Sequence, residues 1–368
     1  MTHRERFKKV AGREKADRAV FDLCGCPQTL IDYPETREAL KKHLKLRGDK
    51  KGNFPVDERI LTFFDIDTRI VGGMPTPRTA HNRTDGEIRY NSYGIGSRPV
   101  NNHYEICYNP LKGATIDEMM NYPLPRAKDV DRKIIESWGE RADYLHKNTD
   151  YAIMAEHPVL GVFEIGCWLF GFDDYLYRMA AEPEIVHAFS KRILDYQKDV
   201  IDIYYGELGR YIDCTSSGDD FGMQTGTFMS VEMFDEFIAP YFSARIAHTK
   251  KYTDAFYEHH TCGSVYSLIP SLVKCGVDIL NPIQPGTFMM EPERLKKDYG
   301  NVISFWGGID TQELLPRSSP DKVESEVRRI LGIMGNEGYI LSPAHCIQPD
   351  VPVANIAAIY KAAKGFYR

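Results

Sequence analysis

The sequence predicts an α/β fold in which parallel strands and helices alternate to form a (β/α)8 barrel. From about residue 150 onward, short β-like runs alternate with stretches whose apolar positions recur every three or four residues. This alternation is typical of parallel strands joined by crossover helices. The chain of 368 residues is long enough for one large barrel. We therefore expect a single domain over residues 1–368.

Six runs in the later part of the chain, or seven with residues 19–25, approach the eight strands that close such a barrel. The six predicted strands are residues 151–157, 211–216, 255–260, 277–282, 302–307 and 338–343. The predicted helices begin near Asp173, Ser230, Ser264, Glu291, Ser319 and Val353. Serine and proline at several of these positions are typical helix-start residues, and Pro183 predicts another start.

Residues 72–125 interrupt the alternation. This segment is rich in glycine, proline and asparagine and contains short alternating runs. Such a composition predicts a β-hairpin excursion. We expect it to be an insertion that folds over one end of the barrel.

Composition and charge exclude several classes of protein. The net charge of −6 comes from mixed signs without a basic stripe, so nucleic acid is not an expected partner. The N-terminus is too charged for a signal peptide, and no apolar run approaches the roughly 18 residues of a membrane span. We expect a cytoplasmic protein whose 8 cysteines are buried thiols or metal ligands.

Two predicted strands end in histidine and cysteine. His260 and Cys262 are two positions apart in "EHHTCGS", so both side chains can point into the barrel mouth. His345 and Cys346 follow the last predicted strand in "SPAHCIQPD". Taken alone, the first pair is also typical of a core histidine and a small buried side chain. Together, the two strand ends predict a zinc site of the catalytic type, with an open coordination position.

A glycine-bracketed loop after residues 211–216 carries adjacent carboxylates, Asp219 and Asp220. At a barrel mouth, a carboxylate can act as a general acid or base or orient an imidazole. Either residue could instead cap a helix. Gln224, in the same loop, is a candidate substrate contact.

The stretch "FEIGCWLFGFDDY" combines Glu164 with the aromatic residues Trp168 and Phe170. A carboxyl group beside aromatic rings suits a pocket for a ring-shaped or methylated substrate, although such clusters also occur in ordinary cores. Asp310, at the end of the strand "FWGGID", is a candidate substrate contact or helix cap.

Several of these stretches resemble the uroporphyrinogen decarboxylase superfamily. The resemblance is carried by "GDDFGMQTGTFMSVEMFDEFIAPYF", "HTCGSVYSLIPSLVKCGVDILNPIQP", "FWGGIDTQELLP" and "SPAHCIQPDVPVANIAAIY", and it covers roughly residues 150–365. It implies a (β/α)8 barrel. The superfamily contains decarboxylases and also methyltransferases that use zinc and a corrinoid, among them demethylating enzymes.

The resemblance is stronger to the methyltransferase branch, whose zinc ligands are a His-x-Cys pair and a cysteine far downstream. His260 and Cys262 match the pair, and a gap-free alignment places His345 at the third position, with Cys346 next to it. The arginine-rich segment with which the decarboxylases bind substrate carboxylates is replaced here by "VFDLCGCPQTL". A corrinoid-binding signature of the form D-x-H-x-x-G is also missing from the sequence.

The resemblance therefore implies a zinc-dependent methyltransferase. It would move a methyl group between a small methylated substrate or thiol and a corrinoid (cobalamin) carried by a separate protein. Porphyrinogen decarboxylation, and a non-catalytic barrel that binds a corrinoid or another ligand, are the alternatives.

Overall fold

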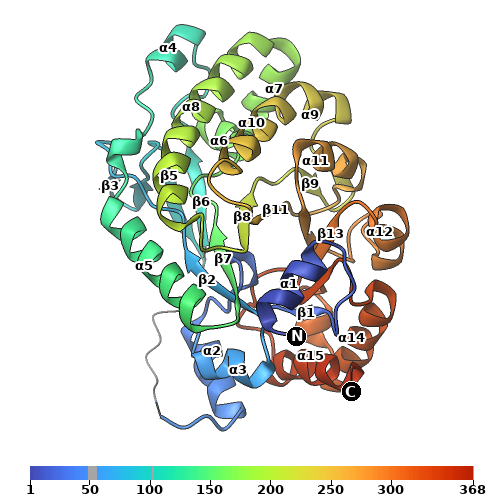
Figure 1. The fold of residues 1–368 in the computed structure, drawn as a ribbon. Coiled ribbons are helices and arrows are strands. Elements are labelled where there is room, and N and C mark those ends of the chain that lie inside the picture. Colours follow the sequence, from blue (N-terminus) through green and yellow to red (C-terminus); the bar gives the residue numbers. More distant parts are fainter. Residues whose placement is uncertain (49–55, 102, 368) are drawn as a thin grey trace.

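Eight parallel strands form one nearly closed barrel with helices around it (Figure 1). A computed structural model describes residues 1–48, 56–101 and 103–367 of the chain. The sheet has the order β1-β14-β13-β12-β11-β8-β7-β2. Its strands are β1 (Val20–Phe21), β2 (Thr68–Gly72), β7 (Ala152–Glu156), β8 (Cys214–Gly218), β11 (Phe256–His260), β12 (Ile279–Ile283), β13 (Ser304–Ile309) and β14 (Tyr339–Pro343). The predicted (β/α)8 class is confirmed.

Each of the seven predicted runs overlaps one of these strands, and β2 is the strand that the sequence did not reveal. Its residues Thr68–Gly72 are all buried. A strand buried on both faces shows no alternation of polar and apolar residues, and this one is short. It also lies beside the glycine-rich segment that was predicted to leave the barrel.

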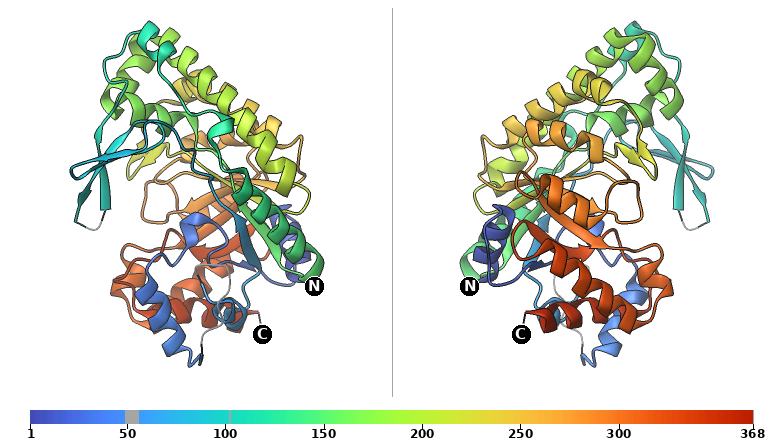
Figure 2. Two further views of the ribbon diagram at one scale, coloured as in Figure 1. Left: turned by 90° about the vertical axis from the view of Figure 1, so that its left-hand side faces the viewer. Right: turned by 90° about the vertical axis from the view of Figure 1, so that its right-hand side faces the viewer.

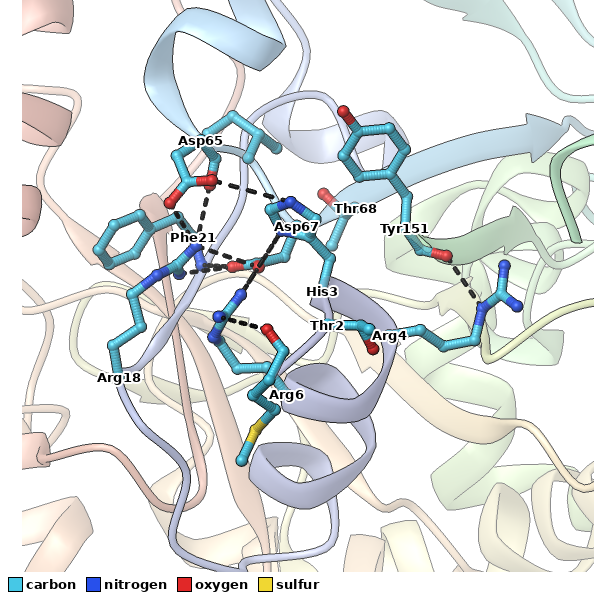
Figure 3. A network of polar contacts seen from close by, with 12 residues as sticks. Thr2, His3, Arg4, Arg6, Arg18, Phe21, Asp65, Asp67, Thr68 and Tyr151 are labelled. Atoms are coloured by element: carbon cyan, nitrogen blue, oxygen red, sulfur yellow. Dashed lines mark hydrogen bonds and ion pairs between the residues drawn. The ribbon is translucent and has the colours of Figure 1, made fainter. Parts of the chain in front are cut away.

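The buried carboxylate of Asp67 joins β1 to β2 and so closes the barrel. The Asp67 N–H donates to the Phe21 carbonyl at 2.9 Å, and the Phe21 N–H donates to the Asp67 side chain at 2.7 Å. His3, Arg6 and Arg18 surround the same fully buried carboxylate (Figure 3). The charge of Asp67 is thus neutralised by residues from the N-terminal segment.

Helices cover the outside of the barrel. They are α2 (Pro34–His43), α3 (Glu58–Phe64), α5 (Arg132–Asn148), α6 (Val162–Phe170), α7 (Phe172–Ala181), α8 (Pro183–Leu208), α9 (Val231–Phe237), α10 (Ala239–Thr249), α11 (Ile269–Cys275), α12 (Pro292–Tyr299), α13 (Leu314–Arg317), α14 (Pro320–Met334) and α15 (Val353–Phe366). The N-terminal helix α1 (His3–Ala11) packs against β1, β7 and β14. Its Phe7 and Val10 belong to the same apolar cluster as inward-facing residues of the strands.

Several predicted helix starts are confirmed. The Ser230 side chain accepts a hydrogen bond from the Met233 N–H and caps α9, and Ser319 caps α14 through the Lys322 N–H. Pro183 is the first residue of α8, and Val353 is the first residue of α15. Helix α6 was not predicted, because its sequence is apolar on nearly every face.

Residues 72–125 contain a four-stranded antiparallel sheet. Its strands are β3 (Arg83–Asp85), β4 (Ile88–Tyr90), β5 (Gly96–Val100) and β6 (His103–Tyr108), and a short helix, α4 (Ile116–Asn121), follows. Figure 2 shows this sheet projecting from the molecule on the side opposite to the N-terminus. No helix in the described part of the chain is both long and apolar enough to span a membrane.

Replacing Asp67 by asparagine is expected to lower the free energy of unfolding by about 3–5 kcal/mol, since two buried arginines would lose a charged partner. Burial acts to raise the pKa of Asp67, but His3, Arg18 and Arg6 outweigh it, so the pKa lies below its usual value of 3.8. The carboxylate therefore stabilises the fold above that value, and this contribution disappears as the pH falls through the pKa of the folded state. Urea denaturation of the wild type and of Asp67→Asn, at neutral and at acidic pH, measures the difference in the free energy of unfolding.

The matched control is Asp17→Asn. Asp17 pairs with the same Arg6 but its side chain is 45% exposed, so we expect a loss below about 1 kcal/mol. Equal losses in the two variants would contradict the role assigned to Asp67 in closing the barrel.

Candidate functional site

His260 lies at the C-terminal end of β11, between β8 and β12. The strand register places it opposite Asn281 of β12, so both side chains occupy the same face. His260 Nδ1 is 2.6 Å from Asn281 Oδ1. The Asn281 amide nitrogen donates to the Trp306 carbonyl at 3.4 Å, which leaves Oδ1 as the acceptor. This network places the imidazole proton on Nδ1 and leaves the Nε2 lone pair free to bind a metal.

Cys262 and His345 complete a group of metal-ligating side chains. Cys262 Sγ lies 3.3 Å from His260 Nε2, and one ligand atom from each of the three residues lies within 4.8 Å of the others. Tetrahedral zinc, with Zn–S near 2.3 Å and Zn–N near 2.0 Å, holds sulfur and nitrogen about 3.5 Å apart. The spacing and the donor types therefore fit zinc.

The protonation states of these ligands also suit a metal. Burial lowers the pKa of His260 and of His345, against an opposing effect of Asp220, so both imidazoles are neutral near pH 7. Burial and the neighbouring Asp220 raise the pKa of the Cys262 thiol well above its usual value. A cation at this point would favour the thiolate.

Cys346 points away from this group. Its buried thiol donates to the Pro27 carbonyl at 3.2 Å. Its backbone N–H donates to His345 Nδ1 at 2.8 Å and helps to orient that ring. Of the two candidates for the third ligand, His345 is thus the one that lies beside His260 and Cys262.

Asp219 and Asp220 have different surroundings. Asp219 is buried and accepts hydrogen bonds from the backbone N–H groups of Phe163 and Glu164, at 3.1 and 2.7 Å, so it caps the N-terminus of α6. Burial raises its pKa to about 7, even though these bonds lower it. Asp220 accepts the Cys262 N–H at 2.7 Å and lies 3.9 Å from His260 Nε2. Asp219 therefore fixes α6, while Asp220 contacts the metal-ligating group.

Glu164 is half-buried on the first turn of α6. Burial, followed by the negative charges of Asp219 and Asp220, raises its pKa to about 8. At neutral pH this side chain is therefore mainly a neutral carboxylic acid, which can donate a hydrogen bond or a proton.

Two cavities flank the group. The first, which we call the amide cavity, has a volume of about 510 Å³ and is lined by Cys262, His345 and the four glutamines Gln224, Gln284, Gln312 and Gln348, among others. The second, the aromatic cavity, has a volume of about 450 Å³, and its lining includes Phe163, Glu164, Trp168, Phe172, Asp220 and Phe228. Gly222 lines both cavities. Cys262 and His345 thus line the amide cavity, and Asp220, which accepts the Cys262 N–H, lines the aromatic cavity.

The predicted substrate contacts are divided between these cavities. Trp168 lines the aromatic cavity, and Gln224 and Asp310 line the amide cavity. The Asp310 side chain also accepts hydrogen bonds from three backbone N–H groups after it, including that of Leu314, so it caps the start of α13. Phe170 lines neither cavity. It is buried against Tyr175 and Phe189 in the apolar core.

Sequence reasoning did not identify several residues of the site. Asn281 orients His260, Gln284 accepts the Gly263 N–H, and Phe228 lines the aromatic cavity. Asn281 and Gln284 lie at the end of the predicted strand 277–282, so the rule that strand ends form a barrel mouth could have identified them. No local pattern marks Phe228.

Comparisons with known proteins agree with this architecture. The family model described as Uroporphyrinogen decarboxylase (URO-D) matches residues 159–366, more than half of the chain. None of the curated proteins matches. Among solved structures, a methyltransferase from Methanosarcina mazei is similar with a TM-score of 0.68 and 14% identity, over 100% of both chains.

Two other solved structures resemble the chain less closely. A B12-independent methionine synthase from Shewanella sp. W3-18-1 has a TM-score of 0.38 and 13% identity, over 62% of this chain and 65% of that one. Xylanase 10B from Thermotoga petrophila RKU-1 has a TM-score of 0.43 and 12% identity, over 69% of this chain and 85% of that one. At these identities, the solved structures support the fold alone.

Replacing Gly161 by alanine tests the contact between Asp219 and α6. A Cβ at Gly161 would lie 1.9 Å from the Asp219 carboxylate. The backbone φ of −68° is allowed for alanine, so the expected effect is a steric clash. Such overpacking should lower the free energy of unfolding by about 1–3 kcal/mol in urea denaturation.

Gly206→Ala is the matched control. Gly206 lies inside α8, and a Cβ there would meet no atom within 4 Å. We expect this variant to be about 0.5–1 kcal/mol more stable than the wild type. A Gly161→Ala variant with wild-type stability would show that Asp219 does not hold α6 tightly.

Proposed function

Because the chain belongs to the uroporphyrinogen decarboxylase family, we propose that it is one of the zinc-dependent methyltransferases of that superfamily. It would move a methyl group between a small methylated substrate or a thiol and a corrinoid carried by a separate protein. The observation that carries this proposal is the group of His260, Cys262 and His345 at the barrel mouth.

These three residues would hold the zinc ion. When bound, zinc supplies Lewis-acid activation of a thiol or of a methyl donor. Asn281 keeps the Nε2 lone pair of His260 directed at the ion, and the Asp220 carboxylate accepts the Cys262 N–H and fixes that turn. Three protein ligands leave a position open for a reactant, as in catalytic zinc sites.

Glu164 would donate or accept a proton at the reacting end of the substrate. As a neutral acid, it can donate to a leaving heteroatom, and as a carboxylate it can accept a proton from an incoming thiol. Trp168 and Phe228, which line the same cavity, would exclude water from it. Asp219 would act as a positioning residue, since it holds the helix that carries Glu164.

The amide cavity is our candidate for contact with the corrinoid. Its glutamine side chains can hydrogen bond with the amide arms at the edge of a corrinoid ring. We also propose that residues 72–125 are an insertion in a single domain and reach the mouth, because Ile106 of β6 lines the aromatic cavity.

Porphyrinogen decarboxylation has less support. A porphyrinogen carries several carboxylates, and a site for them needs basic side chains. Among the described residues, no lysine or arginine lines either cavity. A non-catalytic binding barrel would not need neutral histidines beside a cysteine at the mouth.

Elemental analysis of the purified protein is expected to find one zinc ion per chain. Cys262→Ser and His345→Ala should lose the metal, and Asn281→Ala should weaken zinc binding by about 10–100-fold, the usual effect of losing a residue that orients a ligand. The affinity is measured by competition with a chelator.

Cys346→Ser is the matched control for these variants. Its thiol contacts the Pro27 carbonyl, so this variant should keep its zinc. Loss of zinc from Cys346→Ser, with retention in His345→Ala, would reverse the assignment of the third ligand. A wild-type protein without metal, even after loading with zinc, would overturn the zinc site altogether.

Methyl transfer is measured with free methylcobalamin and a small thiol, through the change in corrinoid absorbance. We expect thiol-dependent demethylation by the zinc-loaded protein. Glu164→Gln keeps the shape of the side chain and should lower the rate by about 10²–10⁴-fold, the usual contribution of a general acid or base. Decarboxylation of uroporphyrinogen without any methyl transfer would overturn the proposal, and corrinoid binding without turnover would favour a binding barrel.

A further inference from the structure

The aromatic cavity combines ring surfaces with negative charge. Phe172 and Phe228 meet at 4.9 Å between ring centroids, and Phe163 lies 6.3 Å from each of them. Trp168 adds an indole ring to the same lining. Such ring faces attract cations and apolar groups alike.

Among the described residues, no lysine or arginine lines this cavity beside its acidic groups, although the charge of the buried Arg245 acts on Asp219. Glu164 and Asp220 line it, and Asp219 lies directly behind them. In the part of the chain that the structure describes, neither Glu164 nor Asp220 forms an ion pair with a lysine or arginine. Lys112, on the loop after β6, is bound to Asp173 instead. The cavity therefore disfavours anions and attracts cations.

Its size restricts the ligand further. A volume of about 450 Å³ is at the small end of the usual range for ligand pockets, which is about 300–1,000 Å³. A corrinoid is too large for it, whereas a head group with a few carbon atoms around a nitrogen fits.

From these three features we propose that the aromatic cavity binds a methylated ammonium group, as the methyl-bearing end of the substrate. This inference rests on the proposed methyl transfer and names the class of its small substrate. A methylated ammonium ion presents a weakly hydrated positive surface, so it loses little hydration energy when it moves from water onto ring faces. Glu164 and Asp220 balance its charge, and its methyl groups would lie near Asp220, which accepts the Cys262 N–H.

Protonation of Glu164 gives the binding a pH dependence. Burial and the neighbouring Asp219 and Asp220 raise the pKa of Glu164 to about 8, and a bound cation would lower it. The affinity for a permanent cation should therefore rise between pH 7 and pH 9.

The experiment compares choline with 3,3-dimethyl-1-butanol, which has the same shape but carries a carbon atom in place of the charged nitrogen. Calorimetry on the full chain, without corrinoid or thiol, measures both affinities at pH 7 and pH 9. We expect choline to bind at least about 10-fold more tightly than its neutral analogue, the order expected for a cation on desolvated ring faces. Choline binding should also tighten as the pH rises.

Two variants test whether the preference for choline arises in the aromatic cavity. Glu164→Gln should weaken choline binding about 10-fold and reduce the pH dependence, while leaving the binding of the neutral analogue unchanged. Asp173→Asn removes an exposed carboxylate near the cavity that already pairs with Lys112, and we expect it to bind choline as the wild type does.

Equal affinities for choline and its neutral analogue would overturn the proposal, as would preferential binding of anisole, which would indicate a neutral aryl ether. The experiments distinguish failure of this inference from failure of the proposed function. A protein that demethylates methylcobalamin with a thiol but binds no choline is a methyltransferase with a different small substrate.

Discussion

The structure depends on the closure of the barrel between β1 and β2. In the described part of the chain, β1 pairs with β14 and β2 pairs with β7, and no strand ladder joins β1 to β2. The Asp67 carboxylate bridges them, and an ionised group in such a place would be very unfavourable without nearby positive charge. Arg6 and Arg18 supply that charge. The N-terminal segment is thus part of the barrel, and the closed ring of strands brings the ends of β11 and β14 to one mouth.

The sequence contained enough information for the barrel, because amphipathic helices and short buried strands leave local patterns. It also indicated where His260 and Cys262 would lie, since residues two apart at a strand end share a face. The choice between His345 and Cys346 could not be made in this way. Adjacent side chains point in different directions after a strand, and the contact with Pro27, which is more than 300 positions earlier in the chain, holds the thiol away from the group.

The same limit applies to Asp219. Its two hydrogen-bond donors lie 55 and 56 positions away, so no spacing within "SGDDFG" identifies it as a cap for α6. Phe170 shows the reverse case. Its position near Glu164 and Trp168 in the sequence predicts a pocket residue. The rotation of α6, however, directs Trp168 to the aromatic cavity and Phe170 to the core. Roles that depend on packing between distant segments cannot be read from local patterns.

The arrangement of the two cavities limits how a transfer reaction could proceed. Where they meet, they share the backbone of Gly222, and a Cβ there would lie 2.6 Å from the Cys262 carbonyl oxygen. Glycine therefore avoids a clash with the Cys262 main chain at the position that both cavities share. Direct transfer of a methyl group needs donor and acceptor on opposite sides of the moving carbon. Reactants held in separate cavities would meet from two sides of Gly222, an arrangement that a single pocket of the same volume would not impose.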